Sequence, residues 1–529
     1  MDQVTIRGIA APALVALLGL SAVVASYVGV FVGGIGWDVE FDVGAYLQVV
    51  QLDSLGSLDD AYARIVYTSE FYGLLLPQVA ELLWDPLGLP GVFEPGNLQA
   101  YQLLGAINVS LAVAGAAAVA FAIWTVFRSP LAATFAWALV VSMPLYAGLA
   151  SIDWKDVPIA VGVSLLSTGL VVSLSLSTSK RRMVGGLLFS SAGAIVAVAS
   201  RPGAWIIISL IALCALAILG VVKSIQRSIG DFRAPLISVG TASLATAIFL
   251  WLTNPIARLG VLQWLLDAAV VSQNNPWWGV VRTNGIDVNA ANLPLWYPAA
   301  WLAAQLPLLT LFAVLIAALF ALGSLVSWQA APSRRELILM IPLFVQSIIA
   351  PALIVSTRPV IYDGIRHLLF LVPALVAVSA ITVVGLERLT QRGHVQSVRA
   401  IPAVFAVVVV AASVWAILRW LPYEYAFTNP VAGRDTQSRD WELDYWGVSA
   451  IEGHRRLEEL GLSPIVVEPT DATSRSVGAV SRESLDSEVK EYGLYVFLRG
   501  DSSIGECELR FSIERDGHTL GQGARCSMR

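Results

Sequence analysis

The chain has 529 residues, of which 57% are hydrophobic and only 13% are charged, and its mean hydropathy is +0.72. Soluble domains carry roughly 25% charged residues, so this composition excludes a soluble globular protein, which would expose far too much apolar surface. The 33 basic and 38 acidic residues give a net charge of −5, and no basic run exceeds Lys180-Arg181-Arg182. These values exclude nucleic acid as the main partner and predict a polytopic α-helical membrane protein.

Apolar runs long enough to cross a bilayer recur along the chain. A hydrocarbon core of about 30 Å needs about 20 helical residues. We identify eleven such runs and therefore expect about 11 transmembrane helices, near residues 9–33, 100–127, 131–150, 157–178, 184–200, 204–222, 236–254, 306–327, 337–355, 364–386 and 400–420. The first run is too long for a signal-peptide core and has no clear cleavage site after it, so we expect it to remain as an anchor.

Basic residues set the expected orientation of these helices. They gather in the short loops on one side, for example at Arg128, at Lys180-Arg181-Arg182, at Arg334-Arg335 and at Arg388. The positive-inside rule predicts a cytoplasmic N-terminus and, after an odd number of spans, an extracytoplasmic tail. Arg far outnumbers Lys while Ala and Val abound, a bias typical of a high-GC bacterium. We therefore expect a bacterial cytoplasmic membrane.

The predicted organisation is a transmembrane module, 1–420, followed by a small extracytoplasmic α/β tail, 421–529. The module has a first outer loop, 34–99, and a second outer loop, 255–305. In the first loop, an amphipathic helix near Phe71–Trp84 is expected to lie in the membrane plane, with its leucines and Val79 against the interface.

The tail pattern predicts one helix and three strands. The helix is expected from Ser449 to Leu460, and the strands at Pro464–Val467, Tyr492–Leu498 and Glu508–Ile513, with a turn at Asp516-Gly517. Cys507 and Cys526 flank a hairpin-like stretch; they either pair, if the tail faces an oxidising compartment, or stay free.

Three carboxylates, Asp38, Glu40 and Asp42, follow the first apolar run directly. In an extended segment all three point the same way, and in a helix Asp38 and Asp42 stack one turn apart. Either arrangement pairs carboxylates suited to deprotonating a hydroxyl or to holding a divalent cation. The alternative is a solvated acidic start to the loop.

A second charged cluster, Asp153-Trp154-Lys155-Asp156, follows the third apolar run. The loop that holds it is very short, so these charges are expected to lie close to the membrane face. Asp156 could also begin the next helix as its cap or dipole partner. A capping role for Asp156 would not explain why charged residues also stand at positions 153 and 155.

Cations and aromatic residues gather on the same predicted side. Arg201, Arg358, Arg366 and His367 suit an anionic phosphate or diphosphate, although any single Arg could instead anchor to lipid headgroups. Trp277, Trp278 and Trp296 lie in the Asn- and Pro-rich second outer loop, where they could stack on sugar rings or simply lie at the membrane interface.

These residues together resemble a known family. The acidic motif after the first span, Lys155-Asp156-Val157-Pro158 and a polar tail outside resemble the GT-C superfamily of polyprenyl-phosphate-sugar-dependent glycosyltransferases. More narrowly, four motifs resemble a bacterial subgroup related to protein O-mannosyltransferases: Ser200-Arg201-Pro202-Gly203, Trp278-Gly279 with Asn284-Gly285 and Trp296-Tyr297, Tyr362-Asp363-Gly364-Ile365-Arg366-His367, and Asp444-Tyr445-Trp446-Gly447. The resemblance covers most of residues 1–450.

The resemblance implies a GT-C-like fold and a sugar transfer that inverts the anomeric centre. The donor would be a polyprenyl-phosphate sugar held in membrane lipid, and the acceptor a hydroxyl of a cell-envelope glycan, lipid or protein. A first-loop carboxylate would be the general base, with Asp38 preferred over Asp42. Because this chain has Asp38-x-Glu40 where the family usually has an adjacent Asp-Glu pair, Glu40 stays a candidate.

The resemblance also implies roles for the remaining site residues. Asp153 and Asp156 would position the acceptor. The donor phosphate would meet Lys155, Arg201, Arg358, Arg366 and His367. The sugar would meet Trp277, Trp278, Asn284, Trp296 and Tyr362.

Several enzyme signatures are missing from the sequence. It contains no Gly-x-x-x-x-Gly-Lys-Ser/Thr loop, no His-Glu-x-x-His and no Gly-x-Ser-x-Gly, so we expect an already activated substrate rather than ATP, metalloprotease or serine-nucleophile chemistry. No cofactor is required; a divalent cation, Mg or Mn, is left open, and no metal-binding residue is assigned. The alternative function is a transporter or flippase for a lipid-linked or anionic substrate, which would bury charges at the bilayer midplane.

Overall fold

The computed structural model describes most of the chain. The described residues are 3–34, 36, 38–50, 56–64, 69–87, 98–175, 180–225, 233–275, 277, 279–326, 328–391, 398–433, 440–469, 479–485, 489–498 and 503–527. Side chains are described for fewer positions at the ends of some helices, and those of Asp38 and Glu40 are not among them.

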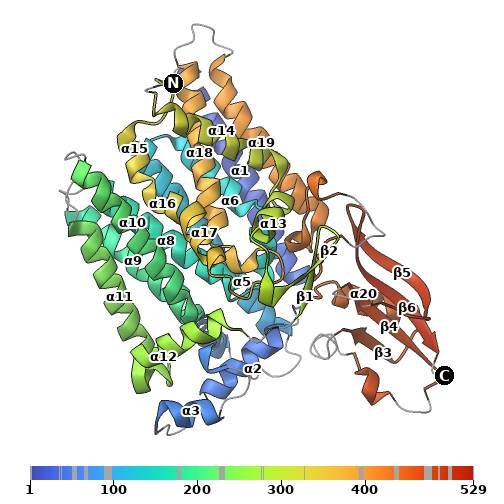
Figure 1. Cartoon of the computed structure of the whole chain (residues 1–529). Coiled ribbons are helices and arrows are strands. Elements are labelled where there is room, and N and C mark those ends of the chain that lie inside the picture. Colours follow the sequence, from blue (N-terminus) through green and yellow to red (C-terminus); the bar gives the residue numbers. More distant parts are fainter. Residues whose placement is uncertain are drawn as a thin grey trace.

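Helices that run alongside one another form the body of the molecule, and a small sheet lies beside one end of the bundle (Figure 1). Within the described part, eight helices contain a stretch long and apolar enough to cross a membrane. They are α1 (Gln3–Val32), α5 (Leu98–Phe127), α8 (Asp156–Ser175), α9 (Lys180–Ser200), α10 (Trp205–Ile225), α11 (Arg233–Thr253), α18 (Leu371–Thr390) and α19 (Ile401–Trp420). The predicted polytopic helical membrane protein is confirmed.

The other three predicted runs also fold as helices, but these are broken or short. The run at 131–150 is α6 (Pro130–Val141) and α7 (Pro144–Ile152), which meet at 54°, and Pro144 begins the second of them. The run at 306–327 is α14 (Leu308–Gly323), bent by 114° from α13 (Tyr297–Gln305). The third is a 16-residue helix, Ile341–Ser356, made of α16 (Ile341–Phe344), a π-helical turn η5 (Val345–Ile349) and α17 (Ala350–Ser356); α15 (Arg334–Leu339) precedes it.

Helix α8 lies at the centre of the bundle. In its most apolar window 94% of residues are buried, whereas α10 and α11 are mostly exposed on their outer sides, as expected for helices that face lipid. Small residues allow its close contact with α9: a side chain at Gly162 would collide with the backbone of Gly193, and one at Gly169 with Ser190. Close packing over small residues is the usual way that helices associate in a membrane.

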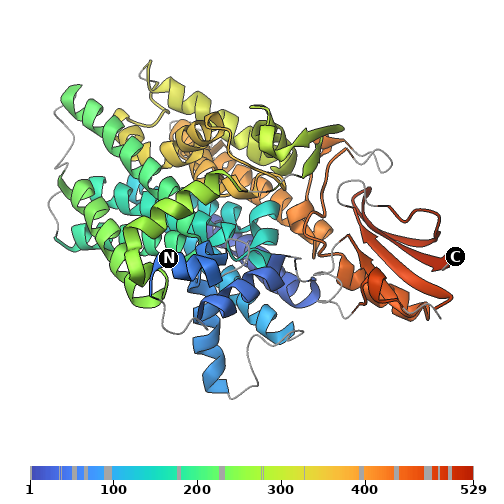
Figure 2. The ribbon, with the colours of Figure 1, turned by 60° about the horizontal axis from the view of Figure 1, so that its bottom comes forward.

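Most of the first outer loop is helical. It contains α2 (Asp38–Val50), α3 (Leu58–Arg64), η1 (Ser69–Phe71), α4 (Leu75–Trp84) and η2 (Asp85–Leu87). Helices α2 and α3 lie with α12 (Ala257–Gln273) at the end of the bundle far from the N-terminus (Figure 1), the end that comes forward in Figure 2.

The helix predicted near Phe71–Trp84 exists as the shorter α4, but the prediction for its apolar face is partly wrong. Leu74 and Leu76 are buried in a cluster with Trp84 and with residues of α5, while Leu82 and Leu83 are exposed. The helix therefore covers part of the protein core with one face, so its leucines do not all lie against the membrane interface.

The second outer loop contains a short antiparallel hairpin. Strands β1 (Val280–Thr283) and β2 (Ile286–Asn289) pair through a two-residue turn, followed by η4 (Ala290–Asn292). Both turn residues have positive φ, +50° at Asn284 and +74° at Gly285, which is typical of the type I′ hairpin turn.

The tail is a four-stranded mixed sheet with one helix. It comprises α20 (Ala450–Glu459), β3 (Ile465–Glu468), β4 (Glu491–Phe497), β5 (Glu508–Arg515) and β6 (His518–Ser527), in the order β3-β4-β6-β5, with β3 parallel to β4 and the other pairs antiparallel. The predicted helix, three strands and turn at Asp516-Gly517 are confirmed. Strand β6 was not predicted, because Gly521 and Gly523 weaken its strand pattern. Cys507 pairs with Cys526 of β6.

The tail is attached firmly to the end of α19. Arg419 forms an ion pair with Asp516, and the Trp420 ring lies 5.8 Å from that of His518. Tyr423, directly before the connecting segment η8 (Glu424–Ala426), donates a hydrogen bond to Glu452 of α20 at 2.6 Å. The tail therefore has a fixed position relative to the bundle.

We expect the disulfide to report the side of the membrane on which the tail lies. Of the three cysteines, only Cys214 is free in the structure, and disulfides persist in oxidising compartments. Labelling of the denatured, unreduced chain with a maleimide-linked polymer should therefore modify one cysteine, and labelling of Cys507→Ser should modify two. Modification of all three cysteines in the unreduced chain would contradict an extracytoplasmic tail.

Candidate functional site

A cavity of about 320 Å³ lies between the ends of α8, α9, α10, α12 and α17. One part of its wall is polar and contains Asp156, Arg201 and His367, together with Ser272, Gln273 and Asn275. The rest of the lining is mostly apolar, with side chains such as Ile207, Leu210 and Ile354. The cavity is therefore suited to a ligand with one polar end and one apolar end.

Two arginines share the Asp156 carboxylate at the start of α8. Arg201 Nη1 lies 3.0 Å from Asp156 Oδ1, and Arg366 Nη1 lies 3.5 Å from Oδ2. Arg366 Nη2 also lies 3.1 Å from Asp363 Oδ2. Asp156 and Arg366 are buried, whereas the Arg201 side chain is 29% exposed, so Arg201 is the cation that a ligand in the cavity can reach.

Asp153 holds the start of α8 in place. Its Oδ1 accepts hydrogen bonds from the backbone N–H groups of Lys155 and Asp156, both at 2.9 Å, which is the function of a helix cap. Asp156 was a predicted candidate for this cap, but the cap is Asp153, and Asp156 pairs with the two arginines. Burial, reinforced by the neighbouring Asp156, raises the pKa of Asp153 above its usual range.

Lys155 connects this cluster to the first outer loop. Its Nζ lies 2.9 Å from Asp42 Oδ1 and 5.2 Å from the centre of the Tyr72 ring. Asp42 is buried within α2, and Asp38 begins the same helix one turn earlier. The first acidic cluster therefore begins at the same end of the bundle as the second, and the side chains of Asp38 and Glu40 lie outside the described part.

His367 lines the cavity beside Asp156. Neither of its ring nitrogens has a hydrogen-bond partner among the described residues. Burial and the adjacent Arg366 hold the pKa of His367 well below its usual range, so the imidazole is neutral at pH 7. A neutral imidazole with two unpartnered nitrogens can both donate and accept a hydrogen bond.

Tyr362 joins the second outer loop to the cavity. Its ring is stacked on Trp277 at 4.3 Å, and its hydroxyl accepts a hydrogen bond from Asn275 Nδ2 at 3.1 Å. The edge-on contact between the Tyr362 and His367 rings, at 4.8 Å, continues this aromatic cluster. Trp278 lies outside the described residues.

Three of the predicted site residues are exposed at the surface and do not line this cavity. Asn284 is an exposed residue of the β1–β2 turn, and its positive φ accounts for an Asn at that position. Trp296 precedes α13 and is 43% exposed, and Arg358 is exposed as well. We therefore build no step of the proposed reaction on these three residues.

Two buried residues next to Arg366 received no role in the sequence analysis. Asp363 pairs with Arg366 from three positions earlier, a spacing that could have indicated the pair. Trp446, from the start of the tail, places its ring 5.3 Å from the Arg366 Cζ. No sequence pattern joins residues 366 and 446, so only the fold reveals this contact.

The described residues contain no group of three or more His, Cys, Asp or Glu side chains that could hold a metal ion. Beside the cavity, Asp156 and Asp363 are paired with arginines, and Asp153 accepts hydrogen bonds from backbone N–H groups. No step of the proposed reaction passes through a metal ion.

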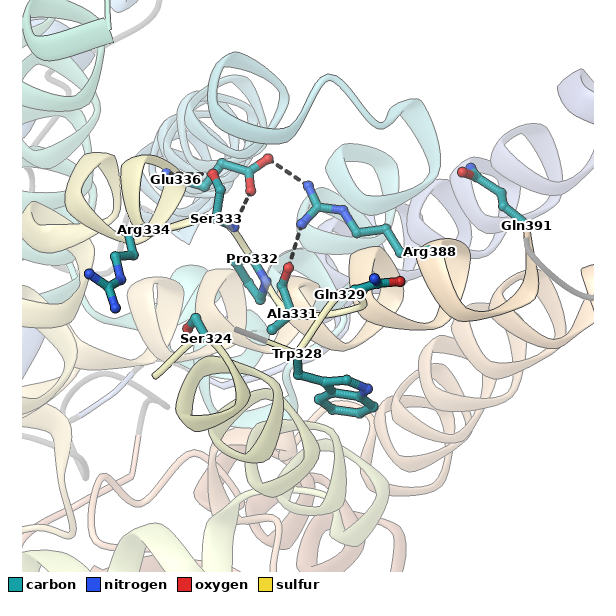
Figure 3. Close-up of a pocket in the computed structure, with 10 residues that line it drawn as sticks. All are labelled: Ser324, Trp328, Gln329, Ala331, Pro332, Ser333, Arg334, Glu336, Arg388 and Gln391. Carbon is teal, nitrogen blue, oxygen red and sulfur yellow. Dashed lines mark hydrogen bonds and ion pairs between the residues drawn. The ribbon is translucent and has the colours of Figure 1, made fainter. Parts of the chain in front are cut away.

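A larger cavity, of about 670 Å³, lies at the other end of the bundle (Figure 3). Its charged residues are largely paired with one another: Arg388 Nη2 lies 2.6 Å from Glu336 Oε1, and Arg388 Nη1 donates to the Ala331 carbonyl at 2.9 Å. Glu336 also closes a capping box with Ser333 at the start of α15. These contacts explain the polar residues structurally, so the smaller cavity is the candidate site.

The sequence matches no protein-family model and no curated protein. Among solved structures, apo ArnT from Cupriavidus metallidurans is similar, with a TM-score of 0.50 and 12% identity over 97% of this chain and 98% of that chain. ArnT bound to undecaprenyl phosphate gives 0.47 at 12% identity, over 96% and 97%. The apo Archaeoglobus fulgidus oligosaccharyltransferase gives 0.49 at 11% identity, over 90% and 65%. The likeness to apo ArnT shows a shared fold, and the predicted GT-C-like fold is confirmed.

Loss of the Asp156 side chain should destabilise the fold more than loss of the Arg201 side chain. Asp156→Ala removes a partner from the fully buried Arg366 and should lower the free energy of unfolding by about 3 kcal/mol. Arg201→Gln removes a partly exposed cation and should cost less than about 1 kcal/mol. Denaturant unfolding of the purified chain in detergent measures both, and equal losses would contradict this division.

Proposed function

We propose that this chain is a membrane glycosyltransferase that moves a sugar from a polyprenyl-phosphate donor to an acceptor hydroxyl outside the cytoplasmic membrane. The observation that carries the proposal is the cavity beside Asp156. It offers a guanidinium and an imidazole at one end and apolar side chains elsewhere. An isoprenoid chain with a phosphate head has the same two-part chemistry.

The fold supports this choice of ligand. The chain shares its fold with ArnT over nearly its full length, and ArnT has also been solved with undecaprenyl phosphate. Because one fold can host many functions, we base the residue roles on the chemistry of this cavity alone.

We assign the donor phosphate to Arg201 and His367. Arg201 has exposed donor groups beside the cavity, and a guanidinium pairs with phosphate oxygens in a bidentate geometry. The neutral His367 would donate a further hydrogen bond to the same phosphate. Arg366 is fully buried behind Asp156, so we assign it to holding Asp156 and to providing positive charge at short range.

The chemical step needs one base and one leaving group. The acceptor hydroxyl attacks the anomeric carbon, the bond from that carbon to the phosphate oxygen breaks, and polyprenyl phosphate leaves with its electron pair. The hydroxyl proton passes to a first-loop carboxylate, and attack opposite the leaving group inverts the anomeric centre. Because Asp42 is already paired with Lys155, we assign proton abstraction to Asp38, one helical turn away.

The donor sugar would lie near the aromatic cluster of the second outer loop. Trp277 and Tyr362 present stacked rings next to His367, and aromatic faces suit the apolar face of a pyranose. Positioning by such rings and by the phosphate contacts would align the anomeric carbon for attack.

The placement of buried charge favours a transferase over a transporter. Among the described residues, the buried ionisable side chains lie at helix ends or outside the spans: Asp42, Glu70, Asp153, Asp156, Asp363, Arg366, Glu424, Glu442, Asp444 and His518. A transporter would be expected to bury charge at the bilayer midplane.

Sugar transfer can be tested with the full chain in lipid nanodiscs and a polyprenyl-phosphate sugar as donor. We expect Arg201→Gln to weaken donor binding and lower kcat/KM by about 100-fold, because each charge-assisted contact to phosphate is worth about 1.5–3 kcal/mol. Arg388→Gln, in the cavity at the other end of the bundle, is the matched control and should transfer sugar normally. Full transfer by Arg201→Gln would contradict the assigned phosphate site.

The base assignment has its own test. Asp38→Asn should reduce kcat by about 10²–10⁴-fold, the usual contribution of a general base, with donor binding unchanged. Full activity of Asp38→Asn would remove Asp38 as the base, and the same substitution at Glu40 or Asp42 would then identify it.

A further inference from the structure

Arg366 is enclosed by aromatic rings as well as by carboxylates. Its Cζ lies 4.9 Å from the centre of the Tyr362 ring and 5.3 Å from that of Trp446. Asp156 and Asp363 pair with its terminal nitrogens. Trp446 and Arg366 are both fully buried, so the guanidinium interacts with the indole without competition from water.

A turn anchored by Asp444 holds Trp446 in this position. The buried Asp444 carboxylate accepts hydrogen bonds from the backbone N–H groups of Val448, at 3.0 Å, and Ser449, at 3.3 Å. The hydroxyls of Tyr425 and Ser449 also donate to it. Gly447 has φ +65°, which a glycine adopts without strain, so the chain can reverse directly after Trp446.

The same turn is fixed to the tail sheet. Tyr495, in the middle of β4, donates a hydrogen bond to Ser449 Oγ at 2.6 Å, and the Phe497 ring packs against Gly447. An unbroken series of contacts therefore leads from the sheet through Ser449 and Asp444 to Trp446.

Trp446 also contacts the start of the first outer loop. Its ring lies so close to Gly36 that any side chain at position 36 would collide with it. Gly36 lies two residues before α2, the helix that begins with Asp38. Trp446 thus touches both the cation behind Asp156 and the segment that leads to the proposed base.

We propose that Trp446 is a positioning residue, which holds Arg366 against Asp156 and so makes donor binding depend on the docked tail domain. This inference rests on the proposed function of the cavity. Without the indole, one face of the guanidinium loses its contact and Arg366 can rotate away from Asp156. Asp156 then draws Arg201 toward itself, and Arg201 is less available to the phosphate.

The experiment measures binding of undecaprenyl phosphate to the full chain in nanodiscs. Trp446→Met keeps an apolar side chain but removes the aromatic face, and we expect binding about tenfold weaker than that of the wild type. Trp446→Phe keeps an aromatic face and should restore binding to within about twofold.

Trp420→Met is the matched control. Trp420 is equally buried, and its ring packs against Phe427, just after η8, and His518 of β6. It should lower the melting temperature as much as Trp446→Met does and leave lipid binding unchanged. Equal losses of binding in the two Met variants, or wild-type binding by Trp446→Met, would overturn the inference.

Two further measurements keep the result interpretable. If Trp446→Met does not fold, Tyr425→Phe is the alternative variant, because it removes one donor to Asp444 and leaves the indole in place. We expect it to weaken binding by two- to threefold, and unchanged binding would overturn the inference.

In transfer assays Trp446→Met should raise KM more than it lowers kcat. A wild-type chain that binds no undecaprenyl phosphate would contradict the proposed function itself, whereas wild-type binding with an unaffected Trp446→Met contradicts only the role of Trp446.

Discussion

The arrangement depends on one buried carboxylate that two arginines share. Asp156 and Arg366 are both out of water, and a desolvated charge is tolerated only beside a partner of opposite sign. Asp363, Arg366, Asp156 and Arg201 therefore form a series of alternating charges that must assemble together. The members come from three places, the start of α8, the residue after α9 and the segment before α18, so this requirement fixes how these three parts meet.

Three separate segments converge on this series of charges. The first outer loop contacts it through the ion pair of Asp42 with Lys155, and the second through the stacking of Trp277 on Tyr362. The tail contacts it through Trp446, which packs on Arg366. A cavity with polar and apolar parts lies beside the one arginine that remains partly exposed. A reaction between a lipid-borne donor and a water-borne acceptor needs this kind of boundary position.

The sequence located the helices well because length and hydropathy are properties of the segment itself. All eleven apolar runs are helical, yet Pro144 divides one of them and α4 buries leucines that were expected to face lipid. The contacts of each side chain are harder to predict, since they depend on packing between distant segments. Asp153 and Asp156 lie together as expected, but the capping role of Asp153 and the contact of Trp446 with Arg366 follow from three-dimensional geometry. The resemblance implied that Asn284 binds sugar; the structure shows it as an exposed turn residue, and an Asn suits either position, so residue type alone does not distinguish them.

The Cys507–Cys526 bond joins the turn before β5 to β6, the strand that pairs with β4. Tyr495 of β4 supports the turn that ends in Trp446. The disulfide therefore reinforces the sheet on which this turn rests. A chain made under reducing conditions would lack this covalent support between the strand at the sheet edge and its neighbour.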